Sequence, residues 1–201
     1  MTQAPLSTRR LRLEPLADEH FEAEVELDSD PEVMRYLAGR AMSRDEVAQA
    51  HRRRLRAASE VPGLGFWAGY AADAFVGWWI LQPTGGPDQP RVAGQADLGY
   101  RLLRRHWRNG YASEGARELI RYGFTEVGLE LIFAQTMAVN TASRATMNAA
   151  GLTFARAFVS AETFDNPIEG TELGEVEYEI TRRTWTHQQN GLRIEPPPRE
   201  A

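Results

Sequence analysis

Apolar and polar positions follow two distinct periods along the chain. Residues 9–15 (RRLRLEP) alternate charged and apolar side chains, which is typical of a half-buried strand. Residues 64–71 and 74–81 are apolar runs separated by Ala72-Asp73, and they predict a hairpin. Apolar or alternating runs predict further strands over residues 96–103, 131–139, 153–160 and 175–181. We therefore expect a sheet of about seven strands.

Other segments place their apolar positions three and four residues apart, the spacing of a helix with one buried face. These helices are expected over residues 18–27, 43–60, 111–127 and 141–150, with a short one starting at Asp30-Pro31. Ser43 followed by Glu46 is a capping-box signature, and Gly151 is a natural helix stop. The order of elements predicts an α+β fold: one domain over residues 1–184, then a polar, proline-rich tail over 185–201.

Composition excludes several functional classes. The 201 residues carry a net charge of −5, which argues against a general nucleic-acid partner. No apolar run approaches the roughly 20 residues of a membrane span, so no membrane partner is expected. The first residues lack the apolar core of a secretory signal, and the expected location is the cytoplasm. The chain has no cysteine, and its four histidines show no ligand spacing, so no metal is expected.

A glycine among arginines precedes one of the expected helices. Residues 105–116 read RHWRNGYASEGA, and Arg104 stands just before them. The first amides of a helix lack intrahelical partners, and the helix dipole adds positive charge there, so a phosphate fits such a turn. Arg104, Arg105 and Arg108 would strengthen the positive field. The alternative is a helix that simply starts at Gly110 beside solvated arginines.

Three phosphate-binding patterns can be compared with this turn. The GxxxxGK[ST] loop is excluded because the chain contains no lysine. Residues 110–115 (GYASEG) fit a dinucleotide fingerprint, but the acidic residue it requires, Glu130, precedes the next strand instead of ending it. Residues 107–112 (WRNGYA) resemble the pyrophosphate motif [Q/R]xxGx[G/A] of the GNAT superfamily of acetyl-coenzyme A-dependent N-acyltransferases, with tryptophan in the first place.

A second motif supports this resemblance. Residues 140–152 (NTASRATMNAAGL) follow the family pattern NxxSxxxxxxxGF, with leucine in the last place. Residues 106–116 are similar to the motif of the branch that acetylates the N-terminal alanine of ribosomal proteins. The resemblance implies a GNAT-like twisted, mixed but mostly antiparallel sheet flanked by helices, in which strand four (96–103) and strand five (131–139) splay apart. It also implies acetyl-CoA as the acyl donor.

The resemblance implies a set of coenzyme-binding residues in these motifs. The pantetheine arm would bond to backbone near Leu102, the diphosphate would lie on the amides of the glycine turn, and Asn140 would reach the pantetheine. The full set is Leu102, Arg104, Arg105, Arg108, Asn109, Gly110, Tyr111, Ala112, Ser113, Asn140 and Ser143.

Acetyl transfer to an amine needs a base for the amine and benefits from an acid for the thiolate. The resemblance aligns Glu162 with the general base of the ribosomal-protein branch, and Asp97 on strand four is its rival; a mechanism with no discrete base is the third possibility. Many family members carry an acidic tyrosine seven residues after the asparagine, but Met147 occupies that position here. Ser143 would then be the acid, unless it is only a serine in a first helical turn.

The function implied is an N-acetyltransferase that works by direct attack in a ternary complex. Its acceptor would be a protein N-terminus or a small-molecule amine, and the protein could form a homodimer. One alternative is a non-catalytic acyl-CoA sensor or scaffold; another is a transferase for a longer acyl-CoA. The run 51–56 (HRRRLR) is interpreted as a solvated helix face, or as a border of the 3′-phosphate or of an acidic partner.

Overall fold

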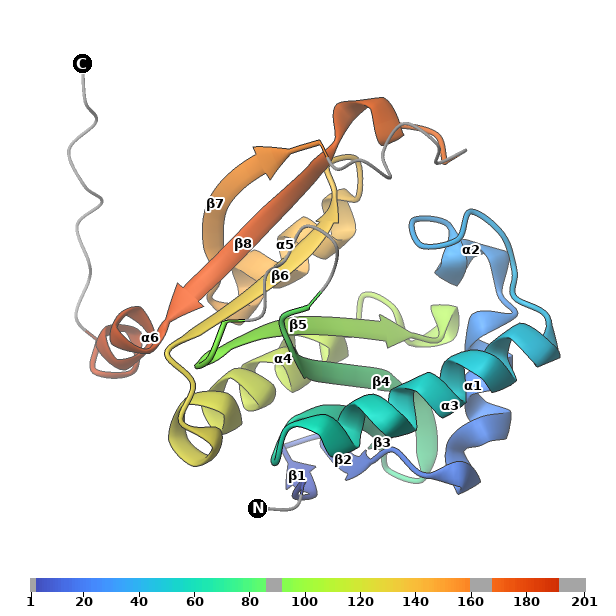
Figure 1. Ribbon diagram of the computed structural model, residues 1–201, viewed down its shortest axis with the longest axis horizontal. Coiled ribbons are helices and arrows are strands. Elements are labelled where there is room, and N and C mark those ends of the chain that lie inside the picture. Colours follow the sequence, from blue (N-terminus) through green and yellow to red (C-terminus); the bar gives the residue numbers. More distant parts are fainter. Residues whose placement is uncertain (1–2, 86–91, 160–167, 192–201) are drawn as a thin grey trace.

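One twisted sheet of eight strands organises the molecule (Figure 1). The computed structural model describes residues 3–85, 92–159 and 168–191. The strands are β1 (Leu6–Ser7), β2 (Leu11–Pro15), β3 (Gly65–Ala71), β4 (Ala74–Pro83), β5 (Gln95–Leu102), β6 (Leu131–Met137), β7 (Thr153–Phe158) and β8 (Glu175–Thr181). They lie in the order β1-β2-β3-β4-β5-β6-β8-β7, and only the β5–β6 pair is parallel. This confirms the expected α+β class; the eighth strand is β1, whose two residues are too few to show a period.

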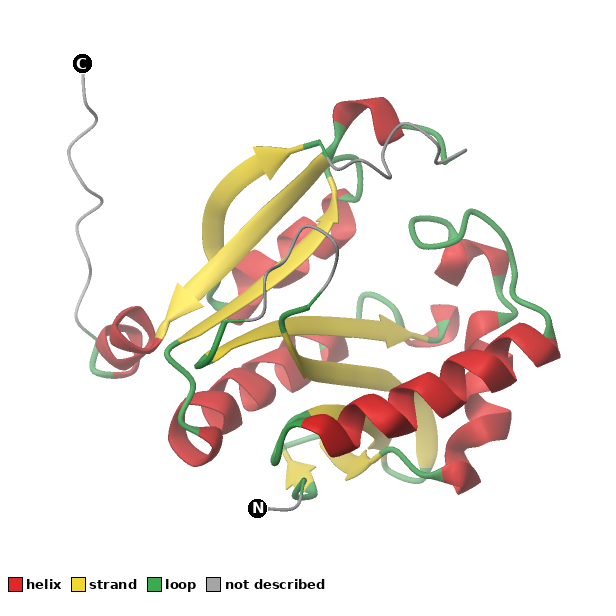
Figure 2. Ribbon diagram, in the orientation of Figure 1, coloured by secondary structure: helices red, strands yellow, loops and turns green. Residues whose placement is uncertain are grey.

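Helices cover both faces of the sheet (Figure 2). The α-helices are α1 (Phe21–Asp28), α2 (Pro31–Met34), α3 (Arg44–Glu60), α4 (Tyr111–Tyr122), α5 (Thr141–Ala150) and α6 (Arg182–Gln189). Successive side chains of β4 point to opposite faces of the sheet and so enter two separate cores. Trp79 packs with α4 and α5 on one face, and Trp78 packs with α1 and α2 on the other. Among the described residues, no helix combines the length and apolarity needed to cross a bilayer.

Several helix boundaries differ from the predicted ones. The helix expected over 18–27 starts as a 3₁₀ turn (η1, Asp18–His20), in which the His20 Nδ1 atom accepts the Ala17 amide at 2.9 Å. The helix expected over 111–127 changes after α4 into a π-helical turn, Gly123–Val127 (η3). Helix α6 crosses the expected boundary at residue 184, because the Trp185 ring packs 5.6 Å from Phe124 in the core. The rest of the expected tail, residues 192–201, lies outside the described residues.

The sheet is interrupted between β5 and β6. These strands pair only at Gln95–Leu131, Ala96–Ile132 and Asp97–Phe133. Beyond that point, β5 stays paired with β4 as far as Leu102, and β6 stays paired with β8 as far as Met137. The two strands therefore diverge towards their carboxyl ends, as Figure 1 shows, and this is the expected splay.

A buried ionic network joins α1, α3 and β5. Glu24 and Asp28 are fully buried, and the Arg54 guanidinium bonds both, at 2.6 Å and 2.8 Å. The His51 Nδ1 atom lies 2.5 Å from the other Glu24 oxygen, and Arg101 pairs with Asp28. The interpretation of residues 51–56 as a solvated face is therefore wrong for His51 and Arg54.

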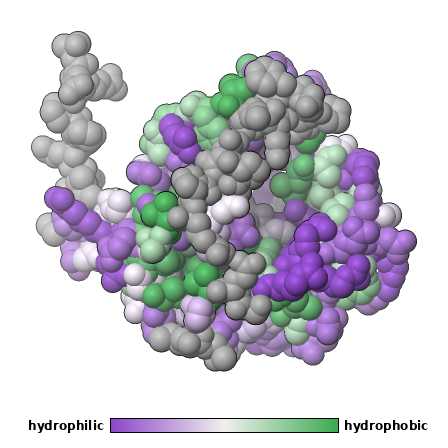
Figure 3. Space-filling model, viewed as in Figure 1, coloured by the Kyte–Doolittle hydropathy of each residue, from purple (hydrophilic) through white to green (hydrophobic). Residues whose placement is uncertain are grey.

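The same helix presents a polar outer face. Arg52 and Arg53 are exposed, as expected for solvated positions. Figure 3 shows hydrophilic side chains gathered over α3 on this side of the molecule. The run 51–56 therefore divides between solvent and the buried network, and its buried half fixes the helical layer onto β5.

Candidate active site

The start of α4 forms an open cup of backbone amides. Gly110 precedes the helix in the left-handed conformation, at φ +78°. The first intrahelical bond runs from the Glu114 amide to the Gly110 carbonyl (3.0 Å), so the amides of Tyr111, Ala112 and Ser113 have no acceptor within the helix. A Cβ built on Gly110 would meet only the Arg10 guanidinium, at 3.4 Å. The space above this glycine can therefore admit a phosphate group.

Two of the three predicted arginines are held away from the cup by acidic partners. The Arg104 Nε atom lies 3.2 Å from an Asp30 carboxylate oxygen, and the Arg105 guanidinium pairs with Glu26. This pairing lowers the pKa of Glu26 below its ordinary value. Arg108 is exposed, and no ion pair joins it to another side chain in the described parts of the chain. Of the three, Arg108 is thus the one available for an anion without breaking an ion pair.

Arg10 is a cation at the cup that the sequence did not reveal. It lies in the turn between β1 and β2, and its guanidinium bonds the Glu114 carboxylate at 2.6 Å and 2.7 Å. The same guanidinium stacks 4.7 Å over the Tyr111 ring. The Thr8 hydroxyl donates to Glu114 at 2.5 Å and helps to hold the carboxylate. The first turn of α4 is therefore clamped with a positive group beside Gly110.

The edge of β5 offers peptide groups to the gap. The Leu103 amide donates to the Val76 carbonyl on β4 (3.0 Å), so the alternate residues Leu98, Tyr100 and Leu102 turn their peptide groups towards the splayed side. The Leu102 carbonyl is already used, because it accepts the Trp107 indole N–H at 2.7 Å. The Leu102 amide and the Tyr100 peptide group still face the splayed side, and the predicted backbone contact near Leu102 remains a prediction.

Asn140 and Ser143 lie together at the start of α5, on the far side of the gap. The Asn140 Oδ1 atom caps the helix by accepting the Ser143 amide at 3.2 Å, and its amide nitrogen donates to Thr136 at 3.1 Å. Tyr100 reaches Ser143 from β5: its hydroxyl donates to the Ser143 carbonyl at 3.0 Å and lies 3.1 Å from the Ser143 Oγ atom. Burial raises the pKa of Tyr100 to about 12. No sequence motif pointed to Tyr100.

Asp97 is the described carboxylate at the narrow end of the gap. It belongs to the last β5–β6 pair before the strands diverge, and it accepts the Gln82 side-chain amide at 3.1 Å. Burial raises its pKa to about 6, and the nearby Glu177 charge adds to the effect. A carboxylate with this pKa is ionised at neutral pH yet basic enough to accept a proton from an amine. The rival base Glu162 lies outside the described residues.

Met147, which stands where many family members carry a tyrosine as the acid, is part of the core. Met147 is 2% exposed and packs in the larger apolar cluster. In the described residues, no group of three histidine, aspartate or glutamate side chains is arranged to hold a metal ion.

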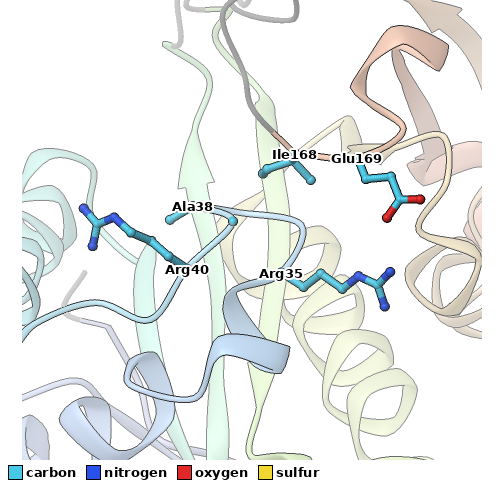
Figure 4. A pocket seen from close by; sticks show the side chains of 6 residues that line it. Arg35, Ala38, Arg40, Ile168 and Glu169 are labelled. Carbon is cyan, nitrogen blue, oxygen red and sulfur yellow. The ribbon is translucent and has the colours of Figure 1, made fainter.

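A polar cavity of about 350 Å³ lies between the segment after α2 and residues 168–169 (Figure 4). The lining residues are Arg35, Ala38, Gly39, Arg40, Ile168 and Glu169. A Cβ on Gly39 would lie 3.0 Å from Ile168, so the two segments are in contact. Arg40 is paired with Glu46 at 2.5 Å, whereas the Arg35 guanidinium stacks 5.3 Å from the Tyr36 ring. The cavity is therefore lined by charges of both signs.

The fold and site together define an acyl-coenzyme A-dependent transferase, and comparisons with known proteins agree. The model of the acetyltransferase (GNAT) domain matches residues 10–153, which include the cup, the gap and Ser143. This match covers more than half of the chain, and the protein belongs to that family of acetyltransferases.

Individual relatives support this membership. The chain is 44% identical, over 93% of its own length and 80% of the relative's, to FsC-acetyl coenzyme A-N(2)-transacetylase of Aspergillus fumigatus. A GNAT-family acetyltransferase from Bacillus anthracis has the same fold, with a TM-score of 0.71 at 20% identity over 90% of this chain and 99% of that one. So does spermidine N-acetyltransferase from Vibrio cholerae in complex with CoA and spermine, with a TM-score of 0.71 at 14% identity over 89% and 99%. The enzyme is thus an N-acetyltransferase that uses acetyl-CoA.

Proposed function

We propose that this enzyme acetylates the primary amine of a small molecule, in the way that its Aspergillus fumigatus relative is named for acetylating N(2) of FsC. The observation that carries the proposal is the open amide cup at Gly110 beside a gap between two strands. The similarity to that relative over 93% of the chain supports an acceptor of the same class. A protein N-terminus is the second candidate acceptor, favoured by the likeness of residues 106–116 to the ribosomal-protein branch.

The coenzyme would lie across α4, β5 and α5. Its diphosphate would accept hydrogen bonds from the amides of residues 111–113, with Arg108 supplying positive charge. The Arg10 guanidinium, held beside Gly110 by its ion pair with Glu114, would be a further donor. Its amide-containing arm would bond the free edge of β5 in the manner of an added strand, at Tyr100 and Leu102. The thioester would then reach the narrow end of the gap, where Asp97 lies.

The residues at that end suit transfer without a covalent enzyme intermediate. The Asp97 carboxylate takes a proton from the ammonium group, directly or through one water, and the neutral nitrogen attacks the thioester carbonyl. The C–N bond forms, the C–S bond breaks, and its electron pair leaves with sulfur as the thiolate, while the nitrogen releases its second proton to water and becomes an amide. Ser143 donates a hydrogen bond to that thiolate. Glu162 is the alternative base in this scheme.

The cavity after α2 would receive the rest of the acceptor molecule. Glu169 on its wall is exposed, and an acidic side chain attracts a cationic amine towards the site. Arg35 on the opposite wall would suit a carboxylate or carbonyl oxygen of the same molecule. Both contacts fit an acceptor that carries several polar groups around its amine.

An acceptor panel tests the proposal. Purified enzyme is given acetyl-CoA with FsC, spermidine or a peptide that begins with alanine, and thiol release and product mass are measured against a reaction without acceptor. Acetylation of FsC supports the proposal, and acetylation of the peptide alone would replace it with the N-terminal candidate. A thermal shift with CoA but no turnover would favour a sensor or scaffold. Faster reaction with succinyl-CoA would identify a longer acyl donor.

A further inference from the structure

Two hydroxyl groups meet where β5 and β6 have separated. Tyr100 comes from β5, three residues past the last β5–β6 pair, and Ser143 comes from the first turn of α5, which follows β6. Their oxygens are 3.1 Å apart, so the pair bridges the two sides of the gap. An acyl-coenzyme arm that lies in the gap would run beside this pair, with its thioester between Ser143 and Asp97.

The two contacts that Tyr100 makes with Ser143 have different chemical consequences. The Ser143 carbonyl can only accept, so the Tyr100 hydroxyl donates to it at 3.0 Å, and this contact ties β5 to the backbone of α5. The phenol has a single proton, so while it donates to the carbonyl, the contact with Oγ is a hydrogen bond from the serine hydroxyl to the phenol oxygen. When the serine proton turns to an anionic acceptor, the Tyr100 proton turns to Oγ in its place, and Oγ stays beside the phenol. Removing the Ser143 side chain abolishes the second contact and leaves the first one intact.

Acyl transfer makes use of a fixed hydroxyl at this place. When the C–S bond breaks, negative charge collects on sulfur, and a donor that is already oriented stabilises that charge without reorganisation. Free serine hydroxyls rotate among several positions, and Tyr100 removes that freedom. The phenol keeps its proton throughout, because burial raises the pKa of Tyr100 to about 12, well above that of an ordinary thiol. Of the two protons that the ammonium group loses, one goes to the base and one to water, and CoA leaves as the thiolate.

We propose that Tyr100 is a positioning residue for the acetyl transfer, which holds the Ser143 hydroxyl where it donates a hydrogen bond to the departing thiolate. This inference rests on the proposed function and names a group that acts in the same site. The group that stabilises the leaving thiolate is then the Ser143 hydroxyl on α5, and the Tyr100 phenol on β5 holds it in place.

A double-mutant cycle tests this role. Tyr100→Phe keeps the ring and its packing, and we expect it to lower kcat by about 5–10-fold, the rate equivalent of one hydrogen bond, with little change in the KM for acetyl-CoA. In the Ser143→Ala background the same substitution should have no effect on kcat, because Oγ is already gone. In the Ser143→Thr background, where a hydroxyl is retained, the effect should return. Tyr178→Phe is the matched control, because this buried phenol lies 3.4 Å from Arg144 of α5.

The outcomes separate a catalytic from a structural role. A purely structural Tyr100 would act through the Ser143 carbonyl, so Tyr100→Phe would lower kcat by the same factor in the wild type and in Ser143→Ala. That result, or an unchanged kcat in Tyr100→Phe, overturns the inference while leaving the proposed function in place. If Tyr100→Phe does not fold, equal kcat in Ser143→Ala and the wild type overturns it instead. A wild type that transfers no acetyl group to any acceptor of the panel refutes the proposed function, and this inference with it.

Discussion

Asp97→Asn is expected to make the protein more stable and less active. The side chain is partly buried, and burial together with Glu177 raises its pKa from an ordinary 3.8 to about 6. The folded protein therefore holds this proton more tightly than the unfolded chain does. As pH rises from about 4 to about 6, the native state loses stability relative to the unfolded state, because the carboxylate must ionise in an unfavourable place.

The size of this effect follows from the two pKa values. Their difference corresponds to a cost of about 3 kcal/mol at pH 8, where the carboxyl is ionised in both states. At pH 4 the same relation gives about 0.5 kcal/mol, because the folded carboxyl is then protonated and the unfolded one is only about half ionised. Solvent contact of the partly buried side chain makes 3 kcal/mol an upper value. Asparagine has the same shape and can still accept the Gln82 hydrogen bond, so Asp97→Asn should recover most of this cost at pH 8 and little at pH 4.

Urea unfolding of the wild type and Asp97→Asn at several pH values between 4 and 8 measures the difference. Carboxylates that do not interact with Asp97 titrate equally in both proteins and cancel in the comparison, whereas the interaction with Glu177 is part of the measured effect. If Asp97 is the base, the same variant should lower kcat by about 10²–10⁴-fold, and the wild-type rate should fall as pH drops through about 6. Glu162→Gln is the parallel variant, which would carry the loss of rate if the base is Glu162.

Two results would refute this reasoning. A stability difference that stays constant from pH 4 to pH 8 would mean that the Asp97 carboxyl is not perturbed by its surroundings. A variant that is less stable than the wild type at pH 8 would mean that the charge itself is stabilising. Unchanged turnover in Asp97→Asn would remove Asp97 from the chemistry and leave the stability argument untouched.

Three further substitutions test the cup and the buried network. Gly110→Ala should cost about 1–2 kcal/mol of stability, because residue 110 has a left-handed backbone, and it should weaken CoA binding measured by calorimetry. Gly191→Ala is the control, at φ +69° with open space around it: it should lower stability similarly but leave CoA binding unchanged. Arg54→Met should lower the free energy of unfolding by up to about 3–5 kcal/mol, because Glu24 and Asp28 are buried and each loses one of its two partners. The exposed Arg53→Met should change it by about 0.5 kcal/mol or less. Arg10→Gln should raise the KM for acetyl-CoA several-fold, with a smaller effect at high salt; an unchanged KM would remove Arg10 from the coenzyme site.

The features that local sequence can reveal were predicted well. The glycine turn before α4 and the interrupted pairing after Asp97 depend on short segments or on family motifs, and both are present in the structure. Arg10 and Tyr100 were missed because each contact joins distant parts of the chain. Arg10 bonds a residue 104 positions away, and Tyr100 reaches a helix 43 positions further on, so no local period connects them.

The interpretation of residues 51–56 failed for a related reason. Charged side chains on a helix are normally assigned to solvent, because burying an unpaired charge is costly. His51 and Arg54 are buried only because Glu24 and Asp28 on α1 face them across the helix interface. The burial of these charged side chains depends on the packing of α1 against α3, so the sequence of either helix alone does not predict it.

The short junction between β5 and β6 has a consequence for handling the enzyme. Beyond three paired residues, each strand keeps an unsatisfied edge inside the sheet, and such edges can recruit strands of other molecules. Coenzyme bound along β5 would shield that edge and also favour the native state by mass action. Purification and storage with CoA should therefore suppress aggregation, which should be most severe in concentrated, coenzyme-free preparations.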